Sequence, residues 1–123
     1  MKSILWVAAG GACGAVLRFA VQEIANTSNS FPWGTFVVNA TGSFAVGLLV
    51  GLFAGTPWFE GVGRTLLVAG LLGGFTTFSA FSAETVLLLE QGRLGSAAVY
   101  VAASVVVCLA AALGGYRLAG ALQ

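Results

Sequence analysis

The feature that most restricts the fold of this chain is a series of four apolar segments, each long enough to cross a lipid bilayer as a helix. Such a helix needs roughly 20 apolar residues. We expect the four helices at about Ser3–Ile24, Trp33–Phe53, Gly63–Leu89 and Leu94–Ala119. The connections are short and carry Gly, Pro or polar residues typical of turns; they lie at Asn26–Pro32, Gly55–Gly61 and Glu90–Arg93. The pattern predicts a single domain, residues 1–123, of four transmembrane helices.

The charged residues are too few to cover a surface that faces water. They make up 7% of the chain, whereas a soluble domain carries about 25%. The chain has no His, which excludes imidazole catalysis and imidazole metal sites. The five basic residues are scattered, which argues against a nucleic-acid surface; they are Lys2, Arg18, Arg64, Arg93 and Arg117. We therefore expect an all-α integral membrane protein and not an enzyme.

The basic residues also fail to specify one orientation in the membrane. With the N-terminus inside, Lys2, Arg64 and Arg117 fall on one side, and Arg93, with Arg18 if it reaches the interface, on the other. A strong bias of Lys and Arg toward one side normally fixes the orientation. The near balance raises the hypothesis that the chain inserts both ways and pairs antiparallel.

Polar and small residues share one ridge of the second segment, because they recur every four residues. Thr35, Asn39 and Ser43 form its polar half, and Gly47, Gly51 and Gly55 extend it. Small residues at this spacing let helix backbones approach closely in lipid, and Gly10/Gly14 and Gly70/Gly74 repeat it. Hydrogen bonding between helices accounts for Thr35 and Ser43. Asn39 is either structural or functional, since an amide at mid-membrane depth is costly without partners.

The third segment contains a sequence that disfavours a continuous helix. Gly73-Gly74 is followed closely by Thr76-Thr77, and both pairs have low helix propensity. We expect a break here. Non-helical backbone at membrane depth persists only inside protein or beside a polar cavity. Its freed carbonyls could hold a cation, and the N-terminus of the following half-helix would favour an anion.

Several side chains near this break have two open interpretations. Phe75, Phe78 and Phe81 recur every three residues and either pack or present electropositive ring edges to an anion. Glu84, an acid inside the third segment, is either functional or an acceptor for a hydroxyl of the fourth segment. Arg18 either extends to the interface or attracts anions.

The fourth segment contributes further donors on one face, with Tyr100, Ser104 and Cys108 four residues apart. Together, the polar and aromatic side chains named above offer many hydrogen-bond donors and few fixed charges. Such a lining suits a small anion, because conduction needs sites that both bind and release the ion.

Three stretches of the sequence resemble the fluoride channels of the Fluc type, also called CrcB proteins. They read GGACGAVLRF (Gly10–Phe19), GTFVVNATGSF (Gly34–Phe44) and GGFTTFSAFS (Gly73–Ser82). Together with the length and the four segments, the resemblance spans nearly the whole chain. It implies an antiparallel, dual-topology homodimer in the inner (plasma) membrane. Two separate pores in that dimer would export fluoride passively.

The resemblance also implies roles for individual residues. The pore residues would be Asn39, Arg18, Phe78, Phe81, Thr77, Tyr100, Ser104 and Glu84, with the two phenylalanines donated by both subunits. A central structural Na⁺ would be held by the backbone carbonyls of Gly73 and Thr76. Phe75 would then be a packing residue. Two positions depart from the family pattern: Cys108 stands where a hydroxyl is expected, and Phe19 where Tyr is frequent.

Two other functions fit a short membrane protein. A proton-coupled transporter of the small multidrug-resistance type is also a four-helix, dual-topology dimer, but it needs a central carboxylate in its first helix. Here the acid of the first segment, Glu23, lies at the segment's end. A structural subunit of a larger complex is the third possibility.

Overall fold

The computed structural model describes residues 2–26 and 31–123, and the fold of these residues is all-helical. Its elements are α1 (Lys2–Ala25), α2 (Trp33–Phe53), η1 (Phe59–Leu72), α3 (Gly73–Phe75), α4 (Phe78–Glu90) and α5 (Leu94–Ala121). They form four helical spans that are long and apolar enough to cross a membrane, the third running over Phe59–Glu90. The predicted all-α fold with four spans is therefore confirmed.

The boundaries follow the sequence signals closely. The second span begins and ends where predicted, and the first and fourth are each a few residues longer. The third begins earlier than predicted, because helical backbone starts at Pro57, and the fixed φ of proline suits the first turn of a helix. Most of the predicted first connection, residues 27–30, lies outside the described residues.

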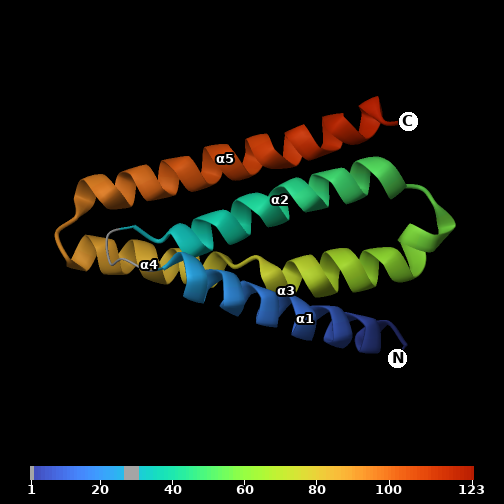
Figure 1. The fold of residues 1–123 in the computed structure, drawn as a ribbon, viewed down its shortest axis with the longest axis horizontal. Coiled ribbons are helices and arrows are strands. Elements are labelled where there is room, and N and C mark those ends of the chain that lie inside the picture. The colour runs from blue at the N-terminus through green and yellow to red at the C-terminus, as the bar shows by residue number, and fades with distance from the viewer. Residues whose placement is uncertain (1, 27–30) are drawn as a thin grey trace.

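The four spans run up and down, so that both termini lie at the same end of the molecule (Figure 1). α2 packs along α5, and α1 packs against η1 and α3. η1 is a π-helix with a wider turn than an α-helix, and at its end the Gly73 N–H reaches the Val68 carbonyl five residues back. The first part of the third span, η1 and α3, thus packs against α1, and its second part, α4, packs against α5.

The glycines spaced four apart lie mainly where helix backbones meet. A Cβ on Gly14 would collide with backbone atoms of Leu71 and Phe75, and a Cβ on Gly47 with the Ala112 carbonyl. The close-packing role predicted from their spacing is confirmed at these positions. Gly55 differs, because it has nothing within 4 Å and a φ of 81°. That left-handed conformation strains any residue with a Cβ. Gly55 is therefore needed for the turn after α2 and not for packing between helices.

Two neighbouring glycines of α5 give a test of this packing. A Cβ at Gly115 would collide with the Phe44 carbonyl, whereas Gly114 has nothing within 4 Å. We expect Gly115→Ala to lower the Tm of the purified protein by roughly 5–10 °C, since overpacking costs about 1–3 kcal/mol. Gly114→Ala, the matched control, should leave the Tm unchanged or raise it, because Ala is the better helix former. Equal effects of the two substitutions would contradict the assigned contact.

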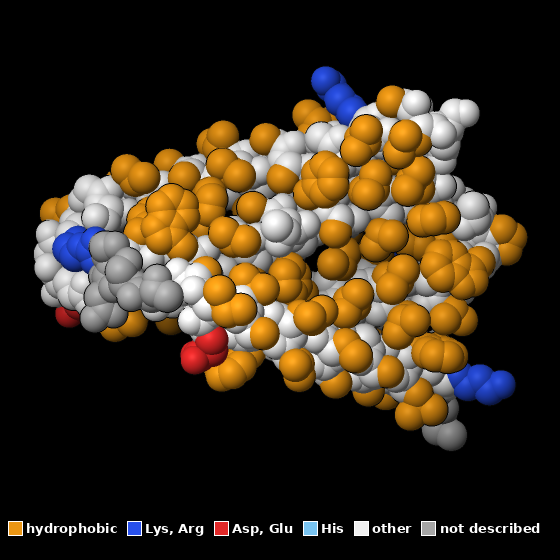
Figure 2. All heavy atoms as spheres, in the orientation of Figure 1, with side chains coloured by type: hydrophobic (Ala, Val, Ile, Leu, Met, Phe, Trp, Pro, Cys, Tyr) orange, Lys and Arg blue, Asp and Glu red, His pale blue; other side chains and the backbone are white. Residues whose placement is uncertain are grey.

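Hydrophobic side chains cover most of the surface (Figure 2). Large residues such as Ile4, Leu109 and Val106 are between 65 and 71% exposed. On the face shown, few Lys, Arg, Asp or Glu side chains interrupt this hydrophobic cover (Figure 2). A mainly apolar surface is expected of helices surrounded by lipid.

Candidate functional site

The site is built around an interruption of the third span. Thr76 (φ −77°, ψ 157°) and Thr77 (φ −153°, ψ 116°) are extended, between α3 and α4. Of the two pairs that predicted a break, Gly73-Gly74 is helical and Thr76-Thr77 forms the break. Gly74 allows close packing of α3 against α1, because a Cβ there would lie 2.5 Å from the Gly11 carbonyl oxygen. The helix is therefore interrupted after Phe75 and not at the glycines.

Asn39 of α2 holds the extended segment in place. Its Nδ2 donates to the Thr77 carbonyl at 3.0 Å, and its Oδ1 accepts the Thr77 backbone N–H at 2.8 Å. The side-chain amide thereby satisfies backbone groups that the helix no longer satisfies, which is what allows such backbone within a membrane. An asparagine amide has two N–H hydrogens, and this pairing uses one of them. The second is available to another acceptor.

The same interruption redirects two hydrogen bonds that a continuous helix would make. The Thr77 N–H bonds to Asn39 rather than to the Gly73 carbonyl. The Ala80 N–H bonds to Thr77 Oγ1 at 3.1 Å, which caps α4, rather than to the Thr76 carbonyl. The carbonyls of Gly73 and Thr76 are thus released from helical bonding, and Arg18 Nη1 approaches the Thr76 oxygen at 3.5 Å.

These two carbonyls are also the groups that could hold a cation. Within the ranges 2–26 and 31–123 no group of three or more His, Cys, Asp or Glu side chains is placed to bind a metal ion. Neutral carbonyl oxygens are hard donors that suit a cation such as Na⁺. Gly73 and Thr76 are also the two positions that the family resemblance implies for a Na⁺ site, and this remains a prediction.

A groove of about 520 Å³ lies beside the extended segment, and it brings together most of the predicted pore residues. Its lining comes from α2, η1, α3, the break, α4 and α5. The predicted residues that line it are Asn39, Gly73, Thr76, Thr77, Phe78, Phe81 and Ser104. Ser43 and Cys108 line it as well, which places a thiol, a weak donor, in the wall.

Ser104 is the least satisfied polar group of this groove. It is only 6% exposed, and its hydroxyl has no hydrogen-bond partner among the residues that the structure describes. A buried hydroxyl without a partner is costly, so most such groups in proteins find one. This donor is therefore free for a molecule or ion that enters the groove.

Two of the three phenylalanines near the break face the groove. The rings of Phe78 and Phe81 have centroids 5.3 Å apart, and Phe81 lies 5.2 Å from Tyr100. Phe75 does not line the groove. It lies over Gly42 instead, where an added Cβ would be 3.4 Å from the Phe75 ring.

A second hollow, which we call the recess, also has Thr77 of the extended segment in its lining. Its volume is about 560 Å³, and it is lined by Ala15, Arg18, Phe19, Gln22, Thr77, Ser79 and Ala80. Arg18 is half-buried here rather than extended toward the end of its helix. The N-terminus of α4 carries a partial positive charge, so both features favour an anion beside Thr77.

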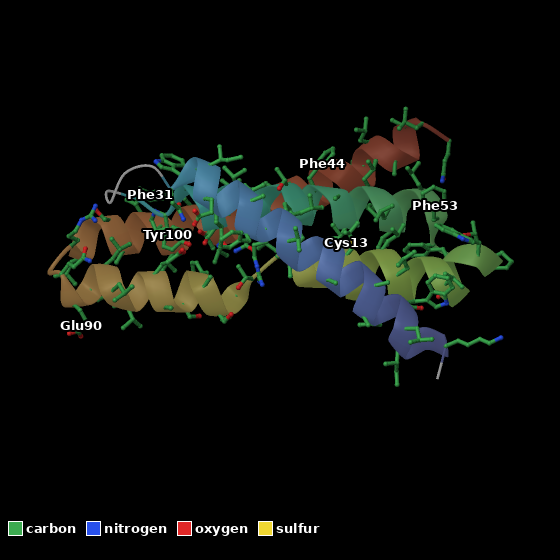
Figure 3. The ribbon with its side chains drawn as sticks, turned by 60° about the horizontal axis from the view of Figure 1, so that its bottom comes forward. Cys13, Phe31, Phe44, Phe53, Glu90 and Tyr100 are labelled. Carbon is green, nitrogen blue, oxygen red and sulfur yellow. The ribbon has the colours of Figure 1, made fainter. Side chains whose placement is uncertain are left out.

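Glu84 and Tyr100 line neither hollow and are joined to each other by a hydrogen bond. Glu84 accepts one hydrogen bond from Thr35 at 2.7 Å and one from the Tyr100 hydroxyl at 2.6 Å. Thr35 in turn accepts from Gln22 Nε2 at 2.9 Å. These contacts fit the interpretation of Glu84 as a structural acceptor and of Thr35 as an interhelical bridge. Figure 3 shows Tyr100 close to Phe31 and far from Phe53.

Gln22 is a site residue that the sequence reasoning missed. It lines the recess together with Arg18 and donates to Thr35. The available signal was its position four residues after Arg18, on the same face of α1. This signal is weak, because Gln22 lies next to Glu23 near the end of an apolar segment, where polar residues are common.

Comparison with known proteins agrees with these observations. A family model described as CrcB-like protein, Camphor Resistance (CrcB), matches residues 5–116. The chain is 49% identical over 110 residues to a Novosphingobium aromaticivorans protein named fluoride-specific ion channel FluC, covering 86% of each chain. Proteins of the same name from Agrobacterium fabrum and Thermus thermophilus are 48 and 44% identical and are covered over 96 and 98% of their lengths.

The family match covers most of the chain, and the relatives align over nearly their full lengths. The four apolar spans and these relatives make the chain a multi-pass protein of the cell membrane. The predicted family resemblance is confirmed: this chain belongs to the CrcB family.

Proposed function

We propose that this chain is a fluoride channel that lets F⁻ leave the cell by diffusion, with no covalent step and no coupled energy source. The observation that carries the proposal is the buried, unpartnered hydroxyl of Ser104 in a groove that also exposes the Asn39 amide. Relatives that carry the name fluoride-specific ion channel support it. A small hard anion needs several short donors in place of its water, and few positive charges that would trap it.

The described contacts suggest an order of events for the ion. Arg18 raises the anion concentration in the recess beside Thr77. Asn39 then donates its remaining amide hydrogen, while it continues to hold the Thr77 backbone. The ring edges of Phe78 and Phe81 face the ion without a formal hydrogen bond. Ser104 supplies the next donor and Thr77 completes the polar lining, while Tyr100 packs against Phe81 and donates to Glu84.

The whole chain would act as a single four-helix domain that forms an antiparallel, dual-topology homodimer, with the Thr76–Thr77 break at mid-membrane depth. Two features favour a second copy. The Phe78 ring lines the groove, yet it is 78% exposed in the single chain. A partner could cover it and close the groove with its own phenylalanines. The near balance of basic residues between the two sides supports insertion in both directions.

A structural Na⁺ at the dimer interface is the proposed cofactor. The Gly73 and Thr76 carbonyls would hold it, and the ion would supply positive charge that ties the broken helices together. Two carbonyls leave most of a cation's coordination shell empty, so a second copy would have to provide equivalent oxygens. Removal of Na⁺ should lower the dimer's Tm while K⁺ fails to replace it; an unchanged Tm would remove this part of the proposal.

The function is tested with liposomes that contain only this protein. Vesicles loaded with equal concentrations of F⁻ and Cl⁻ should release fluoride and retain chloride, as followed with ion-selective electrodes. Release should be independent of a proton gradient, which separates a channel from a proton-coupled multidrug transporter. Retention of fluoride by vesicles with correctly folded protein would refute the proposal. Tags on both termini that are accessible from both sides of the membrane would support dual topology.

A further inference from the structure

A continuous chain of hydrogen bonds connects all four spans behind the groove. Gln22 on α1 donates to Thr35 on α2, and Thr35 donates to Glu84 on α4. Glu84 also accepts a hydrogen bond from Tyr100 on α5. All three bonds are between 2.6 and 2.9 Å. Thr35 and Tyr100 are fully buried. The hydroxyl groups of these two residues are therefore shielded from water.

The direction of each bond is set by the chemistry of its members. An amide N–H can only donate, an ionised carboxylate can only accept, and a hydroxyl has a single hydrogen. Gln22 donates to Thr35, so the Thr35 hydrogen is left to point at Glu84. Both carboxylate oxygens of Glu84 are then occupied, one by Thr35 and one by Tyr100.

Thr35 behaves differently from the other helical hydroxyls, which makes its orientation informative. Several of them donate to the carbonyl four residues earlier in their own helix; these are Thr41, Thr65, Ser82 and Thr85. Thr35 cannot do so within a helical turn, because α2 begins only at Trp33. Its orientation thus depends on the donor from α1 and the acceptor on α4.

The chain reaches the groove through two aromatic rings. The Tyr100 hydroxyl is anchored on Glu84, and the Tyr100 ring lies 5.2 Å from the ring of Phe81, which lines the groove. Loss of the hydrogen bond between Thr35 and Glu84, with no donor to replace it, would displace the Glu84 carboxylate and, with it, this pair of rings. Hydrogen bonds in series polarise one another, so the first donor affects the last acceptor.

We propose that Gln22 is a positioning residue: its amide sets the direction of the four-helix hydrogen-bond chain and thereby holds Glu84, Tyr100 and Phe81 in place beside the groove. Gln22 also lines the recess that contains Arg18. The chain thus extends from Gln22 in the recess to Tyr100, whose ring packs against Phe81 in the groove.

The test is a reversal of the chain. In Gln22→Glu, two carboxylates compete for the one hydrogen of Thr35, and we expect the Tm to fall by roughly 5 °C and fluoride efflux to fall about tenfold. Glu84→Gln alone should be mild, because the Gln22 amide can turn over and accept from Thr35. In the double variant Q22E/E84Q the new Gln donates to Thr35 and the new Glu accepts from it, so every group is satisfied again. Both Tm and efflux should therefore recover to near wild type.

The controls separate direction from charge and from packing. Gln91→Glu places an acid at the exposed end of α4, and its combination with Glu84→Gln should show no coupling. Gln22→Leu removes the donor without adding a charge, and Glu84→Gln should not rescue it. If Gln22→Glu gives no folded protein, the yield of monodisperse double variant replaces the Tm as the readout.

The outcomes are distinct. Recovery in the double variant supports the proposal. A double variant as impaired as Gln22→Glu, or a Gln22→Glu protein identical to wild type, overturns it. The efflux measurement rests on the fluoride conduction proposed above, whereas the Tm measurement does not. Wild-type vesicles that retain fluoride would therefore refute the function and leave the thermal test of Gln22 intact.

Discussion

Replacement of Phe81 by Ile is expected to reduce fluoride efflux from proteoliposomes roughly 100-fold, which corresponds to about 2.7 kcal/mol of barrier. The Phe81 ring lines the groove and lies between Phe78 and Tyr100, with centroid distances of 5.3 and 5.2 Å. Ile retains apolar bulk but has no electropositive ring edge. The measurement is the initial rate of fluoride release, with the amount of folded protein per vesicle held equal.

Phe75→Ile is the matched control for this substitution. Phe75 lies just before the break, close in sequence to Phe78 and Phe81, but does not line the groove. It should retain most of the wild-type flux. In size-exclusion chromatography, the Phe81→Ile protein should elute at the same volume as the wild type, which shows that it is folded and of unchanged size. Equal fluxes in the Phe81 and Phe75 variants would show that the ring at the groove has no special role.

Asn39→Asp should abolish most fluoride conduction and also lower stability. An ionised carboxylate keeps the acceptor for the Thr77 N–H but sets an oxygen against the Thr77 carbonyl, where Asn39 donates at 3.0 Å. It also repels the anion and has no hydrogen to offer it. We expect efflux to fall roughly 100-fold, equivalent to about 2.7 kcal/mol of barrier, and the Tm to fall by about 5–10 °C.

Asn26→Asp is the control for the same chemical change at a site with a different role. The Asn26 Oδ1 accepts the Gly34 N–H at 2.9 Å at the start of α2, and a carboxylate can do the same. This variant should keep both flux and Tm. Wild-type efflux from the Asn39→Asp protein would argue against a donor role for Asn39.

The number, type and approximate bounds of the spans could be read from the sequence. In lipid every backbone polar group must be satisfied within the chain, so an apolar segment of sufficient length specifies a helix almost by itself. Spacing also singled out Asn39, Phe78, Phe81 and Ser104 as candidates whose roles stayed open, and the family resemblance implied that they share one pore. Their roles in conduction remain predictions.

Tertiary structure decided what the local pattern could not. Low helix propensity pointed equally to Gly73-Gly74 and Thr76-Thr77, yet the glycines are helical, with Gly74 packed against Gly11, and Asn39 holds Thr77 extended. Propensity differences of about 1 kcal/mol per residue are overridden by such contacts between distant parts of the chain. Spacing left Glu84 open between two roles, and its partners lie on α2 and α5.

The four apolar helices follow from the length of the apolar segments, and the ridges where donors could gather follow from the spacing within each segment. The exact position of the break, the carbonyls that it releases and the hydrogen bond from Gln22 to Thr35 could be found only in the folded chain. Those depend on which side chains from different helices meet, and hydrogen bonds between helices are set by distance and direction in space rather than by spacing along the chain.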